Sequence, residues 1–277
     1  MIVFAVCNHK GGTGKTTSVM HLAAALGLSG RRTVAIDLDP QGFLTRALGV
    51  DNPPVDRSSL ALFDLEKEVS PDALVSMSGF DLLPSSTSLT KRQRELNKPT
   101  DVLWVKEALQ QSWAEPYEIM IFDTAAAVTV YSLNAMVASE HVVVPVLPEY
   151  QSVVGAEQTF QTASLVRKRL NPNLHGISFL ITQVDARKGI HHTYREYMRD
   201  KYQQRVMEQI IRTSTSLAES YEDGSTLFDH DPHARGARDY ANATDELIRR
   251  ITEASAKSPA AHPDPQDVEP PLEQAMN

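Results

Sequence analysis

A short run near the amino terminus combines glycines, lysines and threonines in an order that suits phosphate groups. It reads Lys10-Gly11-Gly12-Thr13-Gly14-Lys15-Thr16-Thr17 and directly follows an apolar segment, as a phosphate-binding loop does. Glycines let backbone N–H groups approach phosphate oxygens, and a helix that begins at the loop adds the positive end of its dipole. We expect Lys15 to neutralise the β and γ phosphates, Thr16 to ligate Mg²⁺ and Thr17 to contact the α phosphate. The run therefore predicts nucleotide binding.

Three acidic residues follow apolar runs elsewhere in the chain. Asp37 and Asp39 come after residues 33–36, and Asp123 comes after residues 119–122. Acids at the carboxyl ends of strands place negative charge beside the phosphate loop, where Mg²⁺ and an attacking water need it. Asp123 is placed to hold Mg²⁺ through a water molecule. These acids are expected to complete the nucleotide site.

Such a site needs a scaffold that brings several strand ends together. Six short apolar runs have the character of buried parallel strands, at residues 2–7, 33–36, 80–83, 119–122, 141–147 and 177–182. Segments with helical spacing of apolar residues separate these runs. Alternation of this kind predicts an α/β fold, a doubly wound and mostly parallel sheet flanked by helices, which binds ligands at the carboxyl ends of its strands.

The composition is that of a globular chain of 277 residues, with 42% hydrophobic and 22% charged positions. We expect one domain at residues 1–252 and a disordered, acidic, proline-rich tail at residues 253–277. The single cysteine excludes disulfides and cysteine-ligated clusters within one chain. No apolar run is long enough to span a membrane and no secretory signal is evident, so a cytoplasmic location without membrane association is expected.

The loop at residues 10–17 and the segment Asp37-Leu38-Asp39-Pro40-Gln41-Gly42 together resemble the ParA/Soj family of partition ATPases, which belongs to a larger group with MinD. The likeness runs from about residue 1 to residue 251. It implies ATP and Mg²⁺ as cofactors and a homodimer that forms with ATP. It also implies that Lys10 reaches across this dimer to the phosphates bound by the partner.

The resemblance further implies a role for each residue of the site. Lys10, Lys15 and Asp39 would be catalytic, with Asp39 positioning the metal or the hydrolytic water. Asp37 would support the magnesium shell or the loop. The residues that bind nucleotide would be Lys10, Gly11, Gly12, Thr13, Gly14, Lys15, Thr16, Thr17, Asp37 and Asp123. The residues that hold the metal would be Thr16, Asp39 and Asp123.

DNA binding without sequence preference requires clustered positive charge, although the whole chain carries a net charge of −8. The stretch from residue 185 to residue 212 is locally basic, and a solvated helix face would explain the same pattern. Members of the resembled family bind the nucleoid through basic residues near the carboxyl terminus, which favours the DNA interpretation. The candidates here are Arg187, Lys188, Arg195, Arg199 and Arg212.

Two segments depart from the resembled family. Ala125-Ala126-Ala127 stand where two prolines are usual after the acid, which puts the rate of hydrolysis in doubt. Residues 212–216 lack two of the positive charges that relatives often carry before the Leu-Ala-Glu segment.

The leading hypothesis is a ParA-like ATPase that forms an ATP-dependent dimer, binds double-stranded DNA and drives plasmid or chromosome partition, stimulated by a ParB-like partner. The alternatives are a ParA-like ATPase that positions a protein cargo, a MinD-like membrane switch, a metabolic ATP-dependent synthetase, and a nucleotide-binding scaffold that barely hydrolyses.

Overall fold

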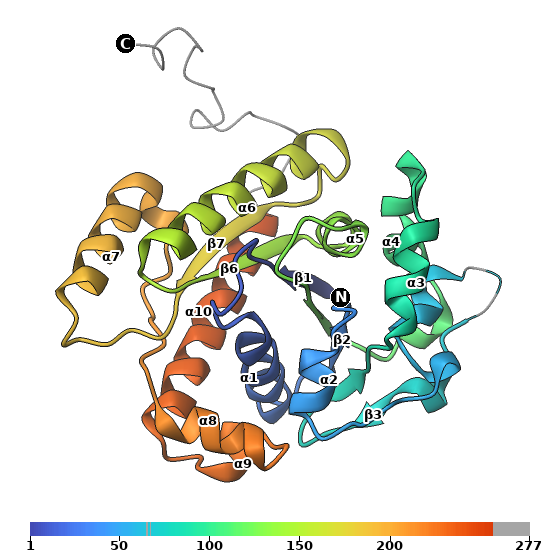
Figure 1. The fold of residues 1–277 in the computed structure, drawn as a ribbon, viewed down its shortest axis with the longest axis horizontal. Coiled ribbons are helices and arrows are strands. Elements are labelled where there is room, and N and C mark those ends of the chain that lie inside the picture. Colours follow the sequence, from blue (N-terminus) through green and yellow to red (C-terminus); the bar gives the residue numbers. More distant parts are fainter. Residues whose placement is uncertain (65, 67, 257–277) are drawn as a thin grey trace, which may run out of the picture.

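The computed structural model describes residues 1–64, 66 and 68–256, along which strands alternate with helices (Figure 1). The strands are β1 (Ile2–Val6), β2 (Thr33–Asp37), β3 (Val75–Ser76), β4 (Asp81–Leu83), β5 (Ile119–Asp123), β6 (His141–Val146) and β7 (Gly176–Ile181). The helices are α1 (Lys15–Leu28), α2 (Phe43–Ala47), α3 (Ser88–Glu95), α4 (Trp104–Ala108), α5 (Val130–Ala138), α6 (Tyr150–Arg169), α7 (Gly189–Tyr202), α8 (Thr215–Glu222), α9 (Leu227–His230) and α10 (Arg235–Ala256). Short 3₁₀ turns occur at Val55–Arg57, Ser59–Phe63, Pro71–Ala73, Pro99–Val102, Ser112–Ala114 and Gln203–Arg205.

The described strands form one sheet in the order β3-β4-β2-β5-β1-β6-β7, parallel except for β3. Helices α1 and α10 cover one face, and α5 and α6 cover the other (Figure 1). The expected α/β fold with a mostly parallel sheet is therefore confirmed.

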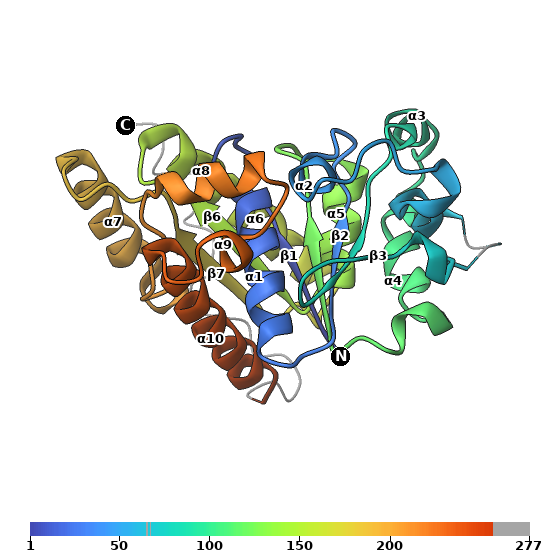
Figure 2. The same ribbon diagram turned by 90° about the horizontal axis from the view of Figure 1, so that it is seen from below.

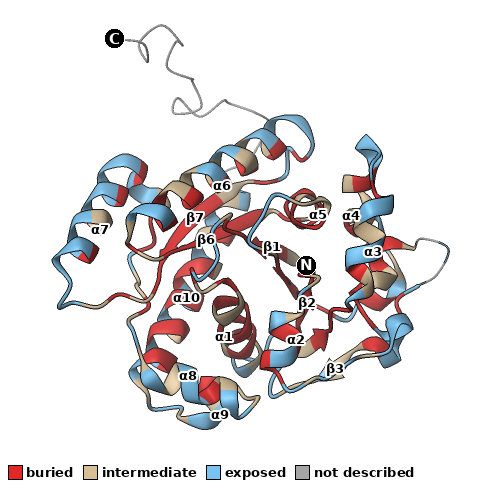
Figure 3. Ribbon diagram, viewed as in Figure 1, coloured by how far each residue is buried: buried red, intermediate tan, exposed pale blue. Residues whose placement is uncertain are grey.

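Burial on both faces explains why the strands are continuous apolar runs. Every residue of β2, β5 and β6 is buried (Figure 3), as parallel sheets with helices on both sides require. Alternate residues of β1 supply the two halves of the core: Phe4 and Val6 pack toward α1 and α10, while Val3 and Ala5 pack toward the opposite face.

The register brings the predicted acids to one edge of the sheet. Asp123, the last residue of β5, pairs with Val6 of β1 on one side and with Asp37 of β2 on the other. The amino-terminal end of α1 lies at the same edge, which is the upper one in Figure 2 and faces away from the chain's amino terminus. The fold therefore gathers the phosphate loop and the acids as the sequence predicts.

The boundaries of the six predicted strands agree with the structure to within one residue at each end. Strand β3 was not predicted, because two residues paired antiparallel at a sheet edge leave no hydrophobic pattern.

Helix α10 continues to Ala256, four residues beyond the domain boundary expected at residue 252. The reason is that residues 253–256 contain no proline or glycine and extend the helix. The rest of the predicted tail, residues 257–277, lies outside the described residues. No helix among the described residues is both long and apolar enough to cross a bilayer.

The single cysteine, Cys7, follows β1 and is buried in the core. Burial raises the pKa of the Cys7 thiol to about 12, against the opposing effect of a hydrogen bond with Thr124. Cys7 is therefore a protonated core residue at neutral pH.

Candidate nucleotide-binding site

The loop between β1 and α1 has the backbone shape that its glycines permit. Gly12 and Gly14 have φ angles of +75° and +83°, a region that glycine enters without a steric penalty. Gly14 caps α1, and its carbonyl accepts the Ser18 N–H at 2.8 Å. The free N–H groups of the first turn of α1 are thus left for an anion.

Two residues after β7 hold this loop from outside. The Thr182 hydroxyl donates to the Thr13 carbonyl at 2.8 Å, and the Gln183 side-chain amide donates to the Gly12 carbonyl at 2.8 Å. These donors occupy loop carbonyls, which leaves the N–H side of the loop free for phosphate. Thr182 and Gln183 were not predicted, since nothing in their local sequence links them to a loop 169 residues away.

The two lysines of the loop have different environments. Lys15 is buried, and its ammonium donates to the Lys10 carbonyl at 3.1 Å. Burial lowers the pKa of Lys15, and the nearby Asp123 carboxylate opposes this shift. Lys10 is exposed, and no carboxylate of the described residues forms an ion pair with its ammonium. Lys15 therefore serves its own site, whereas Lys10 faces outward.

Thr16 and Asp123 meet directly. The Thr16 hydroxyl donates to Asp123 Oδ2 at 2.8 Å, and Asp123 is completely buried. Burial raises the pKa of Asp123 well above its ordinary range, and the adjacent Asp37 carboxylate adds to the effect. A cation placed here would offset the energetic cost that burial imposes on the charged form of this carboxylate.

Asp37 is directed away from the loop. Its carboxylate accepts the backbone N–H and the hydroxyl of Thr45, at 2.9 and 2.7 Å, and the Asp39 N–H at 3.0 Å. Burial raises its pKa to about 6, although these hydrogen bonds oppose the shift. The Asp37 carboxylate therefore holds the segment from Asp39 to Thr45 in place, and its role toward the magnesium shell or the phosphate loop stays a prediction.

Asp39 stands closer to the mouth of the site. Its Oδ1 accepts the Gln41 N–H at 2.8 Å, and its carbonyl accepts the Ser85 hydroxyl at 2.6 Å. Burial raises the pKa of Asp39, and the charge of Lys15 partly offsets this. Thr45, Ser59 and Ser85 fix the backbone around the two acids, and sequence reasoning missed all three of them.

A group with three or more histidine, cysteine or acidic side chains that would hold a metal ion by itself does not occur among the described residues. Mg²⁺ at phosphate sites instead takes few protein ligands and completes its shell with waters and phosphates. One threonine hydroxyl and one or two carboxylates beside the phosphate loop fit that donor set.

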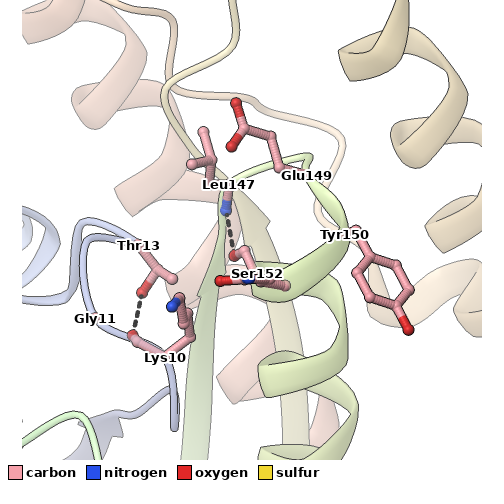
Figure 4. Close-up of a pocket in the computed structure, with 8 residues that line it drawn as sticks. Lys10, Gly11, Thr13, Leu147, Glu149, Tyr150 and Ser152 are labelled. Carbon is pink, nitrogen blue, oxygen red and sulfur yellow. Dashed lines mark hydrogen bonds between the residues drawn. The ribbon is translucent and has the colours of Figure 1, made fainter.

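Two cavities border the loop. One, of about 440 Å³, is lined by Gly14, Thr17, Thr182, Gln183, Ile211, Arg212, Thr213, Ser214, Leu217, Ala218, Tyr221 and Tyr240. The other, of about 250 Å³, lies between the start of the loop and the start of α6 (Figure 4). Tyr150, at this end of α6, is 67% exposed and turns outward.

Comparison with known proteins agrees with this site. A family model described as an AAA domain matches residues 1–176. The chromosome-partitioning ATPase Soj of Thermus thermophilus is 34% identical over 251 residues, which cover 90% of this chain and 96% of the relative. The chain belongs to the ParA/Soj family of partition ATPases. The chromosome partitioning protein ParA of Myxococcus xanthus is 31% identical, with 92% of this chain and 90% of the relative covered.

Solved structures extend the comparison. A structure described as cobyrinic acid a,c-diamide synthase from Mycobacterium smegmatis, with bound ADP and magnesium, has a TM-score of 0.77 and 29% identity over 95% of this chain and 100% of that one. The cell division ATPase MinD of Pyrococcus furiosus has a TM-score of 0.71 at 21% identity, with 90% and 99% covered, and shares the fold. The chain is thus a phosphate-loop ATPase of the ParA/Soj family.

In this ParA/Soj-family chain, the segment Ala125-Ala126-Ala127 lies at the mouth of the site. Ala126 and Ala127 are exposed, and a Cβ placed on Gly11 would lie 3.9 Å from the Ala126 Cβ. The segment therefore borders the loop that binds phosphate, although it lacks the rigidity of two prolines.

Four of the five residues predicted to bind DNA lie on α7 or directly before it, and they differ in exposure and in their partners. Arg187 forms an ion pair with Asp185 at 2.8 Å, and Lys188 lies 3.4 Å from Glu149. Arg195 and Arg199 both lie on α7, where Arg195 is half-buried and Arg199 is exposed.

Arg212 is set apart from the other four candidates. Its guanidinium binds both carboxylate oxygens of Asp239 in α10, and it lines the larger cavity beside the phosphate loop. Its charge is thus balanced locally, and we expect Arg212 to contribute least to any DNA surface.

Proposed function

We propose that this chain is an ATP-driven partition switch. ATP closes a homodimer, the dimer binds double-stranded DNA without sequence preference, and hydrolysis releases it. The observation that carries the proposal is the contrast between the two loop lysines. Lys15 is buried within its own site, whereas the Lys10 ammonium, which pairs with no carboxylate in the part of the chain that the structure describes, lies beside the cavity at the start of α6. A lysine in this position suits a phosphate held by a second copy of the chain.

The proposed chemistry is an in-line attack of water on the γ phosphate. Lys15, together with Lys10 of the second copy, stabilises the charge that grows on the transferring group. Asp39 orients the attacking water or the metal shell. Thr16, Asp39 and Asp123 would hold Mg²⁺, whose bound form neutralises phosphate charge.

The proposed DNA surface centres on α7, where Arg199 is exposed, and on Arg187 and Lys188, which are exposed and directly precede the helix. The cargo, a plasmid or a chromosome, would carry the ParB-like partner that stimulates hydrolysis. The proposed location is the cytoplasm, in association with the nucleoid.

The test is a mobility shift on random-sequence duplex DNA at about 0.1 M salt, since this binding is electrostatic. We expect retardation with ATP but not with ADP, and loss of retardation in Lys10→Ala and Lys15→Ala. Arg199→Glu should lower the slope of log affinity against log salt by about one or more.

The matched control is Arg169→Glu, which changes the charge of the chain equally at an exposed position on α6 and should leave the slope unchanged. An ATP-bound dimer that fails to retard DNA would remove the DNA function. It would direct attention to a protein cargo or to a lipid surface.

A second candidate is an ATP-dependent synthetase, which the likeness to the Mycobacterium smegmatis structure favours. It predicts that a carboxylic acid substrate such as cobyrinic acid stimulates ATP consumption in the absence of DNA. Stimulation by DNA and partner protein, with no response to cobyrinic acid, would exclude it.

A further inference from the structure

Helix α8 brings a tyrosine to the first turn of α1. The Tyr221 hydroxyl lies 2.6 Å from the Thr17 hydroxyl, a distance typical of a strong hydrogen bond between two hydroxyls. Both residues line the larger cavity beside the phosphate loop. Burial raises the pKa of Tyr221 above its ordinary value, so the phenol remains a protonated donor at neutral pH.

Thr17 is also held on its backbone side. The Leu227 N–H donates to Nε2 of His21 at 3.1 Å, which places the ring proton on Nδ1. Nδ1 then donates to the Thr17 carbonyl at 2.8 Å. Helices α8 and α9 therefore both fix Thr17, one through its hydroxyl and the other through its carbonyl.

We propose that Tyr221 is a positioning residue for the α phosphate of the nucleotide and acts through Thr17. A threonine hydroxyl has one hydrogen to donate. When Tyr221 donates to Thr17 Oγ1, the Thr17 hydrogen remains free for an α-phosphate oxygen. The result is a chain of two hydrogen bonds that ends on the anion, in which each bond strengthens the other. The inference rests on the proposed contact between Thr17 and the α phosphate.

Because ADP and ATP share the α phosphate, the effect of Tyr221 should be present in the monomer and independent of DNA. Calorimetric titration with Mg·ADP therefore tests it directly. We expect Tyr221→Phe, which keeps the ring, to weaken ADP binding about 3- to 10-fold, the range of one hydrogen bond. The same substitution should have no further effect in a Thr17→Ala background.

A structural role alone would not change recognition of a single phosphate oxygen. We therefore include the two diastereomers of ADP that carry sulfur in place of an α oxygen, because sulfur accepts hydrogen bonds poorly. The wild type should discriminate between them, and Tyr221→Phe should lose most of this discrimination, as Thr17→Ala does. The control is Tyr117→Phe. It removes a phenol hydroxyl that donates to Asp81, the first residue of β4, at 2.7 Å. This variant should bind ADP as the wild type does.

Three outcomes would overturn the inference: wild-type affinity in Tyr221→Phe, an equal loss in the Thr17→Ala background, or unchanged discrimination between the diastereomers. Failure of the wild type to bind Mg·ADP would be a different result, since it would overturn the nucleotide site itself and the inference with it.

Discussion

His21 shows how one side chain ties the phosphate loop to the carboxyl-terminal part of the chain. It is completely buried in α1, stacks on Tyr240 with ring centroids 4.9 Å apart, and has both ring nitrogens engaged. Burial lowers its pKa from 6.5 to about 4. The neutral ring is therefore the form that the folded protein requires.

This shift predicts how stability depends on pH. Between about pH 7 and pH 5 the unfolded chain binds a proton at His21 and the folded chain does not, so the free energy of unfolding falls as the pH falls. The expected contribution is about 2 kcal/mol. His21→Gln keeps a donor and an acceptor but does not titrate, so its urea-measured stability should decline less over this range. Burial also lowers the pKa of His141, to about 3. Its contribution to the pH dependence of stability is the same in the wild type and in His21→Gln. Parallel pH profiles would contradict the prediction.

The residues of the site divide by how far apart they lie along the chain. The loop at residues 10–17 was predicted because its residues are contiguous and their types and order are typical of phosphate binding. Tyr221 meets Thr17 across 204 positions, and Ser85 meets Asp39 across 46. Serine, threonine and tyrosine are common at solvated surfaces, so no local pattern distinguishes these residues before the chain is folded.

At the scale of elements, α6 is placed by its close approach to the phosphate loop. A Cβ on Gly155 would lie 2.8 Å from the Lys10 Cβ and 2.9 Å from Asn8 Oδ1. One turn further on, the Thr159 hydroxyl accepts the His9 N–H at 3.0 Å. Gly155 thus sets the position of Lys10.

Helix propensity alone predicts that Gly155→Ala stabilises α6 by about 1 kcal/mol. The new methyl group would also displace Lys10, which the proposed dimer requires. We therefore expect Gly155→Ala to weaken ATP-dependent dimerisation by at least about 10-fold. Binding of Mg·ADP to the monomer should change little. Light scattering with a non-hydrolysable ATP analogue measures this. Gly189→Ala is the control, since a Cβ there meets nothing within 4 Å. Normal dimerisation of Gly155→Ala would refute the argument.

The elements were predictable to the extent that burial shapes them. Strands covered on both faces, such as β5 and β6, are uninterrupted apolar runs and were predicted to within one residue at each end. The edge strand β3 has two residues and carries no such signal. The alternation of strands and helices predicted the α/β fold, but the order of the strands in the sheet could not be obtained from spacing, because it depends on long-range pairing.

For the whole molecule, the balance of charge opposes DNA binding. Residues 257–277 carry four acids against one lysine, and thus three of the eight net negative charges. Carboxylates compete with DNA phosphates for the basic residues of a protein at low salt. This competition is screened at high salt.

A chain that ends at Ala256 should therefore bind random duplex DNA about 2- to 5-fold more tightly at about 50 mM salt, and this gain should shrink at about 200 mM. Fluorescence anisotropy in the presence of ATP measures both affinities. A full-length chain in which the four acids are replaced by Asn and Gln is the control for loss of length, and it should behave as the shortened chain does. Equal or weaker binding by the shortened chain would argue against the prediction.

The burial of Cys7 also makes this protein convenient for chemical labelling. The sequence contains no other cysteine, and this one is enclosed in the core as an unreactive thiol. A cysteine introduced at Tyr150, on the exposed end of α6 beside Lys10, would then be the one site that a maleimide dye modifies in the folded chain. The proposed opening and closing of a pair of subunits can thus be tested by fluorescence without first removing a native residue next to the phosphate loop.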